Sequence, residues 1–156
     1  QKNILNALEG IFLLRRFEIE GGRKGFVFYL EDQAEAVFLK NQIQNNDTKY
    51  FQDFEGIIYR NCRVQLEYHL GISYQFFHFL TSGGARVPVA VRTAEGILGF
   101  IPIRDDVITY SQRASAHSFL KCYNNSKIIF VTNVCKISHV KIIDSRSIMI
   151  PLSWLV

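Results

Sequence analysis

Phe26 and Phe28 are the residues whose type and spacing point most directly to a binding chemistry. They lie two positions apart in the segment 23–30, RKGFVFYL, which is rich in residues that favour β-strands. Alternate side chains of a strand point to opposite faces, so we expect Phe26 and Phe28 on one face and Val27 and Tyr29 on the other. Two neighbouring aromatic rings on one strand face offer stacking platforms for unpaired nucleobases.

Both faces of this strand are apolar, so the aromatic face needs a cover. A strand that buries only one face normally carries polar groups on the other. The cover is a nucleobase, a protein partner or another part of this chain, and the sequence leaves these three alternatives open. Under the last alternative, Phe26 and Phe28 are ordinary core residues.

Basic side chains flank the aromatic strand at positions suited to phosphate contacts. Arg23 and Lys24 come directly before it, after a Gly-Gly pair. Of Arg15 and Arg16 in the preceding segment, only one can share the aromatic face, and an inward-facing Phe17 favours Arg16. The alternative interpretation of Arg23 and Lys24 is an ordinary charged hairpin loop.

A hairpin is the element that must position these side chains. Residues 12–19 and 23–30 are rich in strand formers and are separated by Gly21-Gly22, which predicts two antiparallel strands joined by a glycine turn. Before them, apolar residues at helical spacing predict a helix over 1–9, which Gly10 ends.

A helix and a further strand are predicted after the hairpin. Good helix formers and an apolar stripe predict a helix over 31–44. Residues 62–68 alternate polar and apolar, which predicts a half-buried strand. In that strand Arg63 and Gln65 point away from the core, toward the aromatic face.

At these residues the chain resembles the RNA recognition motif family. The segment 24–28, KGFVF, resembles the octamer ribonucleoprotein motif of that family, in which a basic residue and a glycine precede alternating aromatics. Residues 32–37 resemble its second helix, and residues 55–67 resemble its glycine-containing turn and fourth strand. The resemblance covers residues 1–70 and departs from the pattern at Glu31, where a third aromatic is usual.

The resemblance implies a fold, a partner and a set of contact residues. The implied fold is an α/β sandwich, an antiparallel sheet backed by two helices, whose first strand would precede Gln1. The implied partner is single-stranded RNA, stacked on the aromatic rings. The residues that it implies for RNA binding are Arg16, Arg23, Lys24, Phe26, Phe28, Arg63 and Gln65.

Residues 71–156 are expected to form a second, β-rich part of the chain. Strand-like runs at 86–92, 97–103, 107–110, 127–134 and 140–143, together with a short helix over 115–123, predict a small barrel or sandwich. No flexible linker lies near residue 70, so we expect the two parts to pack together. The aromatic segment 74–80 is the candidate to cover Phe26 and Phe28, which would favour a protein-interaction role.

We expect no enzyme, cofactor or metal site in this sequence. No glycine-rich phosphate loop occurs, and neither the histidines nor the cysteines fall at metal-ligand spacing: His69, His78, His117, His139, Cys62, Cys122 and Cys135. Asp105-Asp106 is interpreted as a solvated turn, since adjacent carboxylates in a strand point to opposite faces.

Composition describes a basic globular protein. The 156 residues are 48% hydrophobic and carry a formal charge of +4, which agrees with a polyanionic partner. No apolar run approaches the roughly 18–20 residues that cross a bilayer. Unpaired cysteines favour an intracellular location, nucleus or cytoplasm. The chain begins without Met, and we interpret it as a segment of a longer polypeptide.

The sequence therefore predicts an α+β chain that binds single-stranded RNA, or positions it within a larger ribonucleoprotein or RNA-processing protein. The alternative hypothesis is a protein-interaction or scaffolding module in which the aromatic face is occluded, with other protein subunits or the rest of a longer chain as partners.

Overall fold

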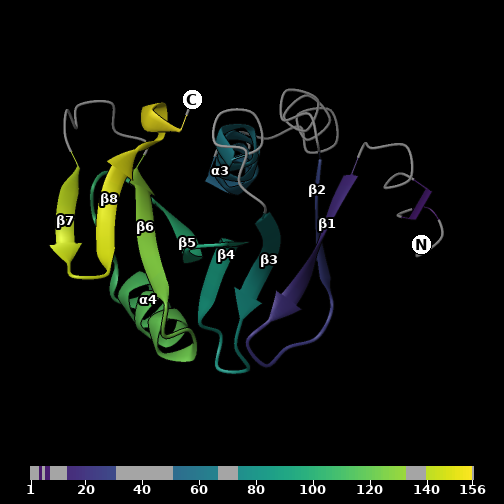
Figure 1. Cartoon of the computed structure of the whole chain (residues 1–156), viewed down its shortest axis with the longest axis horizontal. Coiled ribbons are helices and arrows are strands. Elements are labelled where there is room, and N and C mark those ends of the chain that lie inside the picture. The colour runs from purple at the N-terminus through teal and green to yellow at the C-terminus, as the bar shows by residue number, and fades with distance from the viewer. Residues whose placement is uncertain are drawn as a thin grey trace.

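A single mixed sheet organises the described part of the chain. The computed structural model describes residues 4, 6–7, 14–30, 51–66, 74–132 and 140–155 (Figure 1). Its strands form one eight-stranded sheet in the order β2-β1-β3-β4-β5-β6-β8-β7, so the chain is α+β, as the sequence predicts. The strands are β1 (Leu14–Glu20), β2 (Phe26–Leu30), β3 (Tyr74–Leu80), β4 (Arg86–Thr93), β5 (Gly96–Ile103), β6 (Ser126–Thr132), β7 (Lys141–Asp144) and β8 (Ser147–Pro151).

The predicted hairpin is confirmed in β1 and β2. These strands pair antiparallel, with Arg16 opposite Phe28 and Phe17 opposite Val27. The connecting loop holds glycines with positive φ, including Gly21 at 103°. A Cβ on Gly21 would lie 2.8 Å from the ring of Phe79, so this position needs glycine for both space and backbone conformation.

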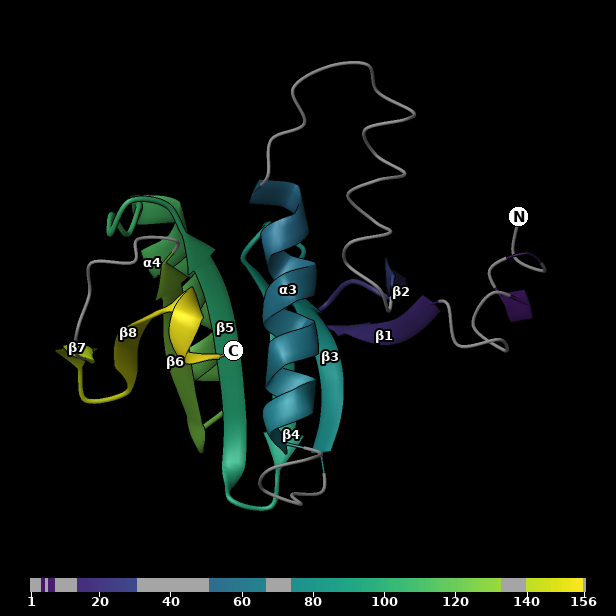
Figure 2. The same ribbon diagram turned by 90° about the horizontal axis from the view of Figure 1, so that it is seen from above.

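The β1–β2 hairpin belongs to the same sheet as the strands that follow residue 70 and does not pack against a face of that sheet. β1 pairs in parallel with β3, with Glu18 beside Phe77 and Glu20 beside Phe79. The prediction that the segment 74–80 covers Phe26 and Phe28 is therefore wrong, because this segment is the neighbouring strand. Strands from both sides of residue 70 share one sheet, and Figure 2 shows β1 and β2 on the far side of α3 from β5, β6 and β8.

The second half combines an antiparallel meander with parallel strands. β3, β4 and β5 pair antiparallel in succession, and helix α4 (Tyr110–Cys122) then crosses to β6, which lies parallel to β5. β8 is parallel to β6, and β7 pairs antiparallel with β8 as the edge strand of the sheet. A short 3-10 helix, η2, spans Leu152–Trp154. Thr109 and Gln112 form a capping box that begins α4.

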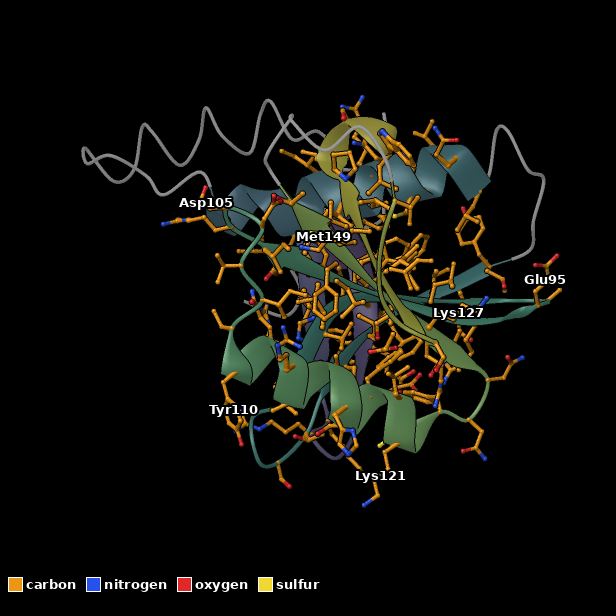
Figure 3. All side chains as sticks on the ribbon, turned by 90° about the vertical axis from the view of Figure 1, so that its left-hand side faces the viewer. Glu95, Asp105, Tyr110, Lys121, Lys127 and Met149 are labelled. Carbon is orange, nitrogen blue, oxygen red and sulfur yellow. The ribbon has the colours of Figure 1, made fainter. Side chains whose placement is uncertain are left out.

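The predicted barrel or sandwich is wrong, because the strands of the second half extend an open sheet between two helices. Strands joined by a crossover helix lie parallel, and the helix then covers one sheet face. Figure 3 shows α3 (Phe51–Val64) above the sheet and α4 below it. The run 107–110 is no strand: Val107 makes an isolated bridge to Arg104, and Tyr110 begins α4.

The strand predicted at 62–68 is helical through Val64, because α3 spans Phe51–Val64. Buried Ile58, Tyr59, Cys62 and Leu66 recur at helical spacing, and this stripe faces the sheet. The fourth strand implied by the resemblance to the RNA recognition motif is therefore wrong. The helix predicted over 31–44 lies outside the described residues.

The core has two halves, one on each face of the sheet. Phe17, Tyr59, Val89 and Phe100 are among the residues buried on the α3 side. On the α4 side, Phe77, Phe79, Phe119, Ile128 and Phe130 are buried among others. Burial on both faces explains why the strands in the middle of the sheet read as continuous apolar runs.

Gly99 provides a direct test of packing between β5 and α4. A Cβ at Gly99 would lie 2.8 Å from Ile128 Cδ1 and 2.9 Å from Phe119 Cε1, and both side chains are fully buried. We expect Gly99→Ala to lower the free energy of unfolding by about 1–3 kcal/mol, measured by urea denaturation. The control is Gly83→Ala, whose Cβ would have no neighbour nearer than 3.9 Å. Equal stability of the two variants would contradict this packing.

Candidate nucleic-acid interface

Arg16, Glu18, Phe26 and Phe28 share one face of the β1–β2 hairpin, and we name this group the hairpin shelf. Arg16 lies opposite Phe28, and Glu18 lies opposite Phe26, so alternation places all these side chains on the same face. Phe26 is 51% exposed, Phe28 is half-buried, and Arg16 and Glu18 are exposed. The prediction that Arg16 shares a face with Phe26 and Phe28 is confirmed by this register.

The guanidinium of Arg16 lies over one ring of the shelf. Its Cζ is 4.8 Å from the centroid of the Phe26 ring, within the range of a cation–π contact. Glu18 adds a carboxylate beside the same ring. The shelf thus presents two aromatic rings, one cation on a ring face and one anion at the margin.

The opposite face of the hairpin is held by α3. Phe17 is only 5% exposed, and its ring centroid lies 4.6 Å from that of Tyr59 and 5.1 Å from that of Tyr29. The Tyr29 hydroxyl donates a hydrogen bond to the Pro88 carbonyl at 3.2 Å. Burial, followed by the negative charge of Glu55, raises the pKa of Tyr29. Because these contacts fix Phe17 and Tyr29 on the α3 face of the hairpin, the shelf side chains point to the opposite face.

Arg23 and Lys24 lie at the end of the hairpin, as predicted. Both side chains are exposed. The backbone N–H of Arg23 donates to the Leu80 carbonyl at 3.3 Å, and Gly22 forms a bridge with Thr81. The loop is thereby attached to the end of β3 while its two charges remain in solvent.

Arg63 and Gln65 do not join the shelf. Arg63 lies in α3 and Gln65 directly follows it, and both are half-buried. α3 packs on the face of the sheet that holds Phe17, whereas Phe26 and Phe28 point to the other face. The alternating pattern at 62–68 belongs to a helix, so its outward face is not the outward face of the sheet.

A polar junction beside the shelf was missed in the sequence. Arg92 binds Glu20 through two hydrogen bonds of 2.7 and 2.6 Å, and the Tyr123 hydroxyl donates to Glu20 at 2.8 Å. The Arg92 Cζ also lies 4.4 Å from the centroid of Phe77. The hydrogen bond from Arg92 lowers the pKa of Glu20, while burial raises that of Tyr123. This junction joins β1, β4 and the end of α4, and its residues lie too far apart in sequence to be paired by pattern.

A second polar network lies on the α3 side of the sheet. Arg86 binds Glu55 of α3 through two hydrogen bonds of 2.6 Å, and its Nε donates to His78 Nε2 at 3.4 Å. The other ring nitrogen of His78, Nδ1, lies 2.9 Å from the Pro88 carbonyl. A carbonyl only accepts, so Nδ1 carries the proton and Nε2 accepts from Arg86.

Three further features bear on the chemistry of the described residues. Among them, no group of His, Cys, Asp and Glu side chains is gathered closely enough to hold a metal ion. Asp105 and Asp106 adopt φ of 53° and 61° in a tight turn closed by a 3.1 Å hydrogen bond from Val107 N to Arg104 O, which confirms the predicted turn. Burial raises the pKa of the Cys62 thiol, which keeps it protonated and unreactive.

Comparisons with known proteins do not assign the chain. No family model, no curated protein and no solved structure matches it. Within the part of the chain that the structure describes, no helix combines the length and apolar character needed to cross a membrane.

His78 predicts a pH-dependent stability. Burial, then the charge of Arg86, lowers the pKa of His78 below its ordinary value of 6.5, and protonation of Nε2 would oppose the Arg86 N–H. Because the unfolded chain binds this proton more readily, stability is fully present above pH 6.5 and falls as pH drops toward the lowered pKa. Glu55 and the Pro88 carbonyl partly offset the effect.

Thermal unfolding measured from about pH 7.5 to about pH 5 checks this prediction. Tm should fall on acidification by about 2–4 °C for each kcal/mol lost. His78→Asn keeps a donor for the Pro88 carbonyl and does not titrate, so its Tm should fall less over the same range. An equal fall in Tm for wild type and His78→Asn would contradict the assignment of this pH dependence to His78.

Proposed function

We propose that the protein binds single-stranded RNA, with the hairpin shelf as the stacking platform. The observation that carries the proposal is the exposure of Phe26, 51%, beside Phe28 and Arg16 on one face of the hairpin. Phe26 is a large aromatic side chain on the edge strand of the sheet, and half of its surface is exposed to water. Such a ring is better suited to contact a flat partner that binds and dissociates than to form part of the protein core. An unpaired base has such a surface, and base–aromatic stacking contributes about 1–3 kcal/mol per base.

The surroundings of the rings supply the charges that an RNA strand needs. Arg16 lies over the Phe26 ring, where its planar guanidinium can stack on a base or move aside to meet a phosphate. Arg23 and Lys24 lie in solvent at the end of the same strand. Affinity should therefore fall as salt concentration rises, because each neutralised phosphate releases counterions.

RNA binding by the hairpin shelf does not require a complete RNA-recognition fold. The described hairpin carries the shelf by itself, whereas Arg63 and Gln65 lie on the other side of the sheet and are not part of the proposed contact. We propose binding without catalysis, inside the cell, as part of a larger ribonucleoprotein or RNA-processing protein. The free thiols of Cys62 and Cys122 agree with a reducing compartment.

A protein partner on the same shelf is the competing function. The sequence hypothesis of occlusion by the segment 74–80 is wrong, so the cover would have to come from elsewhere. A protein interface would use the same rings but would not require the charges of the loop. Binding measurements with RNA separate the two.

Replacing both rings tests the shelf directly. Phe26→Ala with Phe28→Ala should weaken binding of a single-stranded oligouridine about thirtyfold or more, because two stacking contacts are lost. The matched control is Ile142→Ala, which removes an exposed apolar side chain from β7, the strand at the opposite edge of the sheet. Fluorescence anisotropy gives the affinities, and circular dichroism checks that each variant folds.

The outcomes differ between the hypotheses. Retained folding with lost RNA binding supports the shelf, whereas unfolding of the double variant makes the rings structural and rejects it. Wild-type protein that binds no single-stranded RNA rejects the function and favours a protein partner. Glu18→Gln adds a test of opposite sign, since removing the carboxylate beside Phe26 should raise RNA affinity by up to about fivefold.

A further inference from the structure

The exposed side of α4 carries basic residues and no carboxylate. Arg113, His117 and Lys121 recur every four residues, and Tyr110 begins the helix on the same side. All are exposed, Tyr110 at 88%, and the helix YSQRASAHSFLKC contains neither Asp nor Glu. We name Tyr110, Arg113, His117 and Lys121 the α4 ridge, and Figure 3 shows Tyr110 and Lys121 at its two ends.

The α4 ridge and the hairpin shelf are on the same side of the sheet. Glu18 of the shelf lies beside Phe77 in the parallel pairing of β1 with β3, so both point to one face. Phe77 is stacked against Phe119 of α4, with ring centroids 6.4 Å apart. A molecule bound to the shelf therefore meets α4 without passing around an edge of the sheet.

The polar junction brings the end of α4 to the end of β1. Tyr123, two residues after Lys121, donates a hydrogen bond of 2.8 Å to Glu20, the last residue of β1. Directly after Glu20 comes the loop that exposes Arg23 and Lys24. Arg92 neutralises Glu20 at this point, so the junction places no uncompensated carboxylate between the two basic groups.

We propose that an RNA strand stacked on the hairpin shelf continues past the junction onto the α4 ridge. There Arg113 and Lys121, about two helical turns apart, bind separate phosphates of the strand, and Tyr110 stacks on a base. Charge complementarity identifies single-stranded RNA as the occupant of the ridge. Basic side chains without a neighbouring carboxylate suit a phosphate backbone and not an apolar partner. This inference rests on the proposed function and names the extent of its binding site.

The dimensions fit a strand of moderate length. The ridge from Tyr110 to Lys121 is about 16 Å long at 1.5 Å per residue. Three strand spacings separate β2 from β4, beneath α4, which adds about 14 Å. An RNA of about 12 nucleotides should span both surfaces, whereas one of about 4 should occupy the shelf alone.

The experiment compares oligouridines of about 4 and about 12 nucleotides in two charge-matched double variants. Arg113→Ala with Lys121→Ala removes the ridge cations. Arg60→Ala with Lys127→Ala removes one arginine and one lysine that are also exposed, Arg60 on α3 and Lys127 on β6. Both variants carry the same net charge, so a general electrostatic effect acts on them alike.

The ridge variant should bind the longer RNA about tenfold more weakly and the shorter RNA as wild type does. Its salt-dependence slope for the longer RNA should fall by about 1.4, the value for two phosphates on a single strand. Tyr110→Ala should likewise weaken binding of the longer RNA and leave binding of the shorter RNA unchanged. The variant lacking Arg60 and Lys127 should match wild type.

Equal losses in the two double variants, or an unchanged affinity of the ridge variant for the longer RNA, would overturn the inference while leaving the shelf intact. Wild-type protein that binds neither RNA would reject the proposed function together with this extension of it.

Discussion

Burial of Phe17 between the sheet and α3 is the constraint on which the proposed interface depends. A strand has only two faces, so a ring fixed on one of them determines the direction of its neighbours. Phe17 packs against Tyr59 and Tyr29, and the register of β1 with β2 then sends Arg16, Phe26 and Phe28 to the other face. The exposure of Phe26 thus follows from the packing of Phe17, and the two cannot be exchanged by a one-residue slip without exposing the core ring.

Two polar networks hold the hairpin from opposite sides of the sheet. On the α4 side, Glu20 binds Arg92 and Tyr123. On the α3 side, Tyr29 and His78 both meet the Pro88 carbonyl, and Arg86 links His78 to α3. A binding surface on a hairpin at the side of a sheet gains precision when side chains lock that hairpin to rigid elements.

Local periodicity was sufficient for the hairpin and insufficient for what surrounds it. The two-residue alternation in 23–30 predicted the faces of Phe26 and Tyr29 correctly, because successive side chains of a strand point to opposite faces whatever their polarity. In the segment 62–68 the same alternation led to a wrong strand. There the helical stripe of Ile58, Tyr59 and Cys62 begins earlier and outweighs a pattern only a few residues long.

Long-range pairing explains the remaining differences. The segment 74–80 is as aromatic as a core element should be, yet its sequence does not reveal that it lies beside β1 instead of above it. Glu55 and Arg86 are 31 residues apart, and Glu20 and Tyr123 are 103 apart, so no local signal joins them. The position of Arg16 could be predicted because its partner Phe28 is a neighbour across a short hairpin, whereas the α4 ridge depends on how the crossover helix lies on the sheet.

The most direct measurement of the central claim is the NMR signal of the shelf rings during titration with a single-stranded oligouridine. Stacked bases should shift the ring protons of Phe26 and Phe28 upfield, in proportion to RNA bound, while the protons of Phe100, buried on the α3 side, keep their positions. Ring signals of Phe26 and Phe28 that stay unchanged while RNA binds elsewhere would contradict the account.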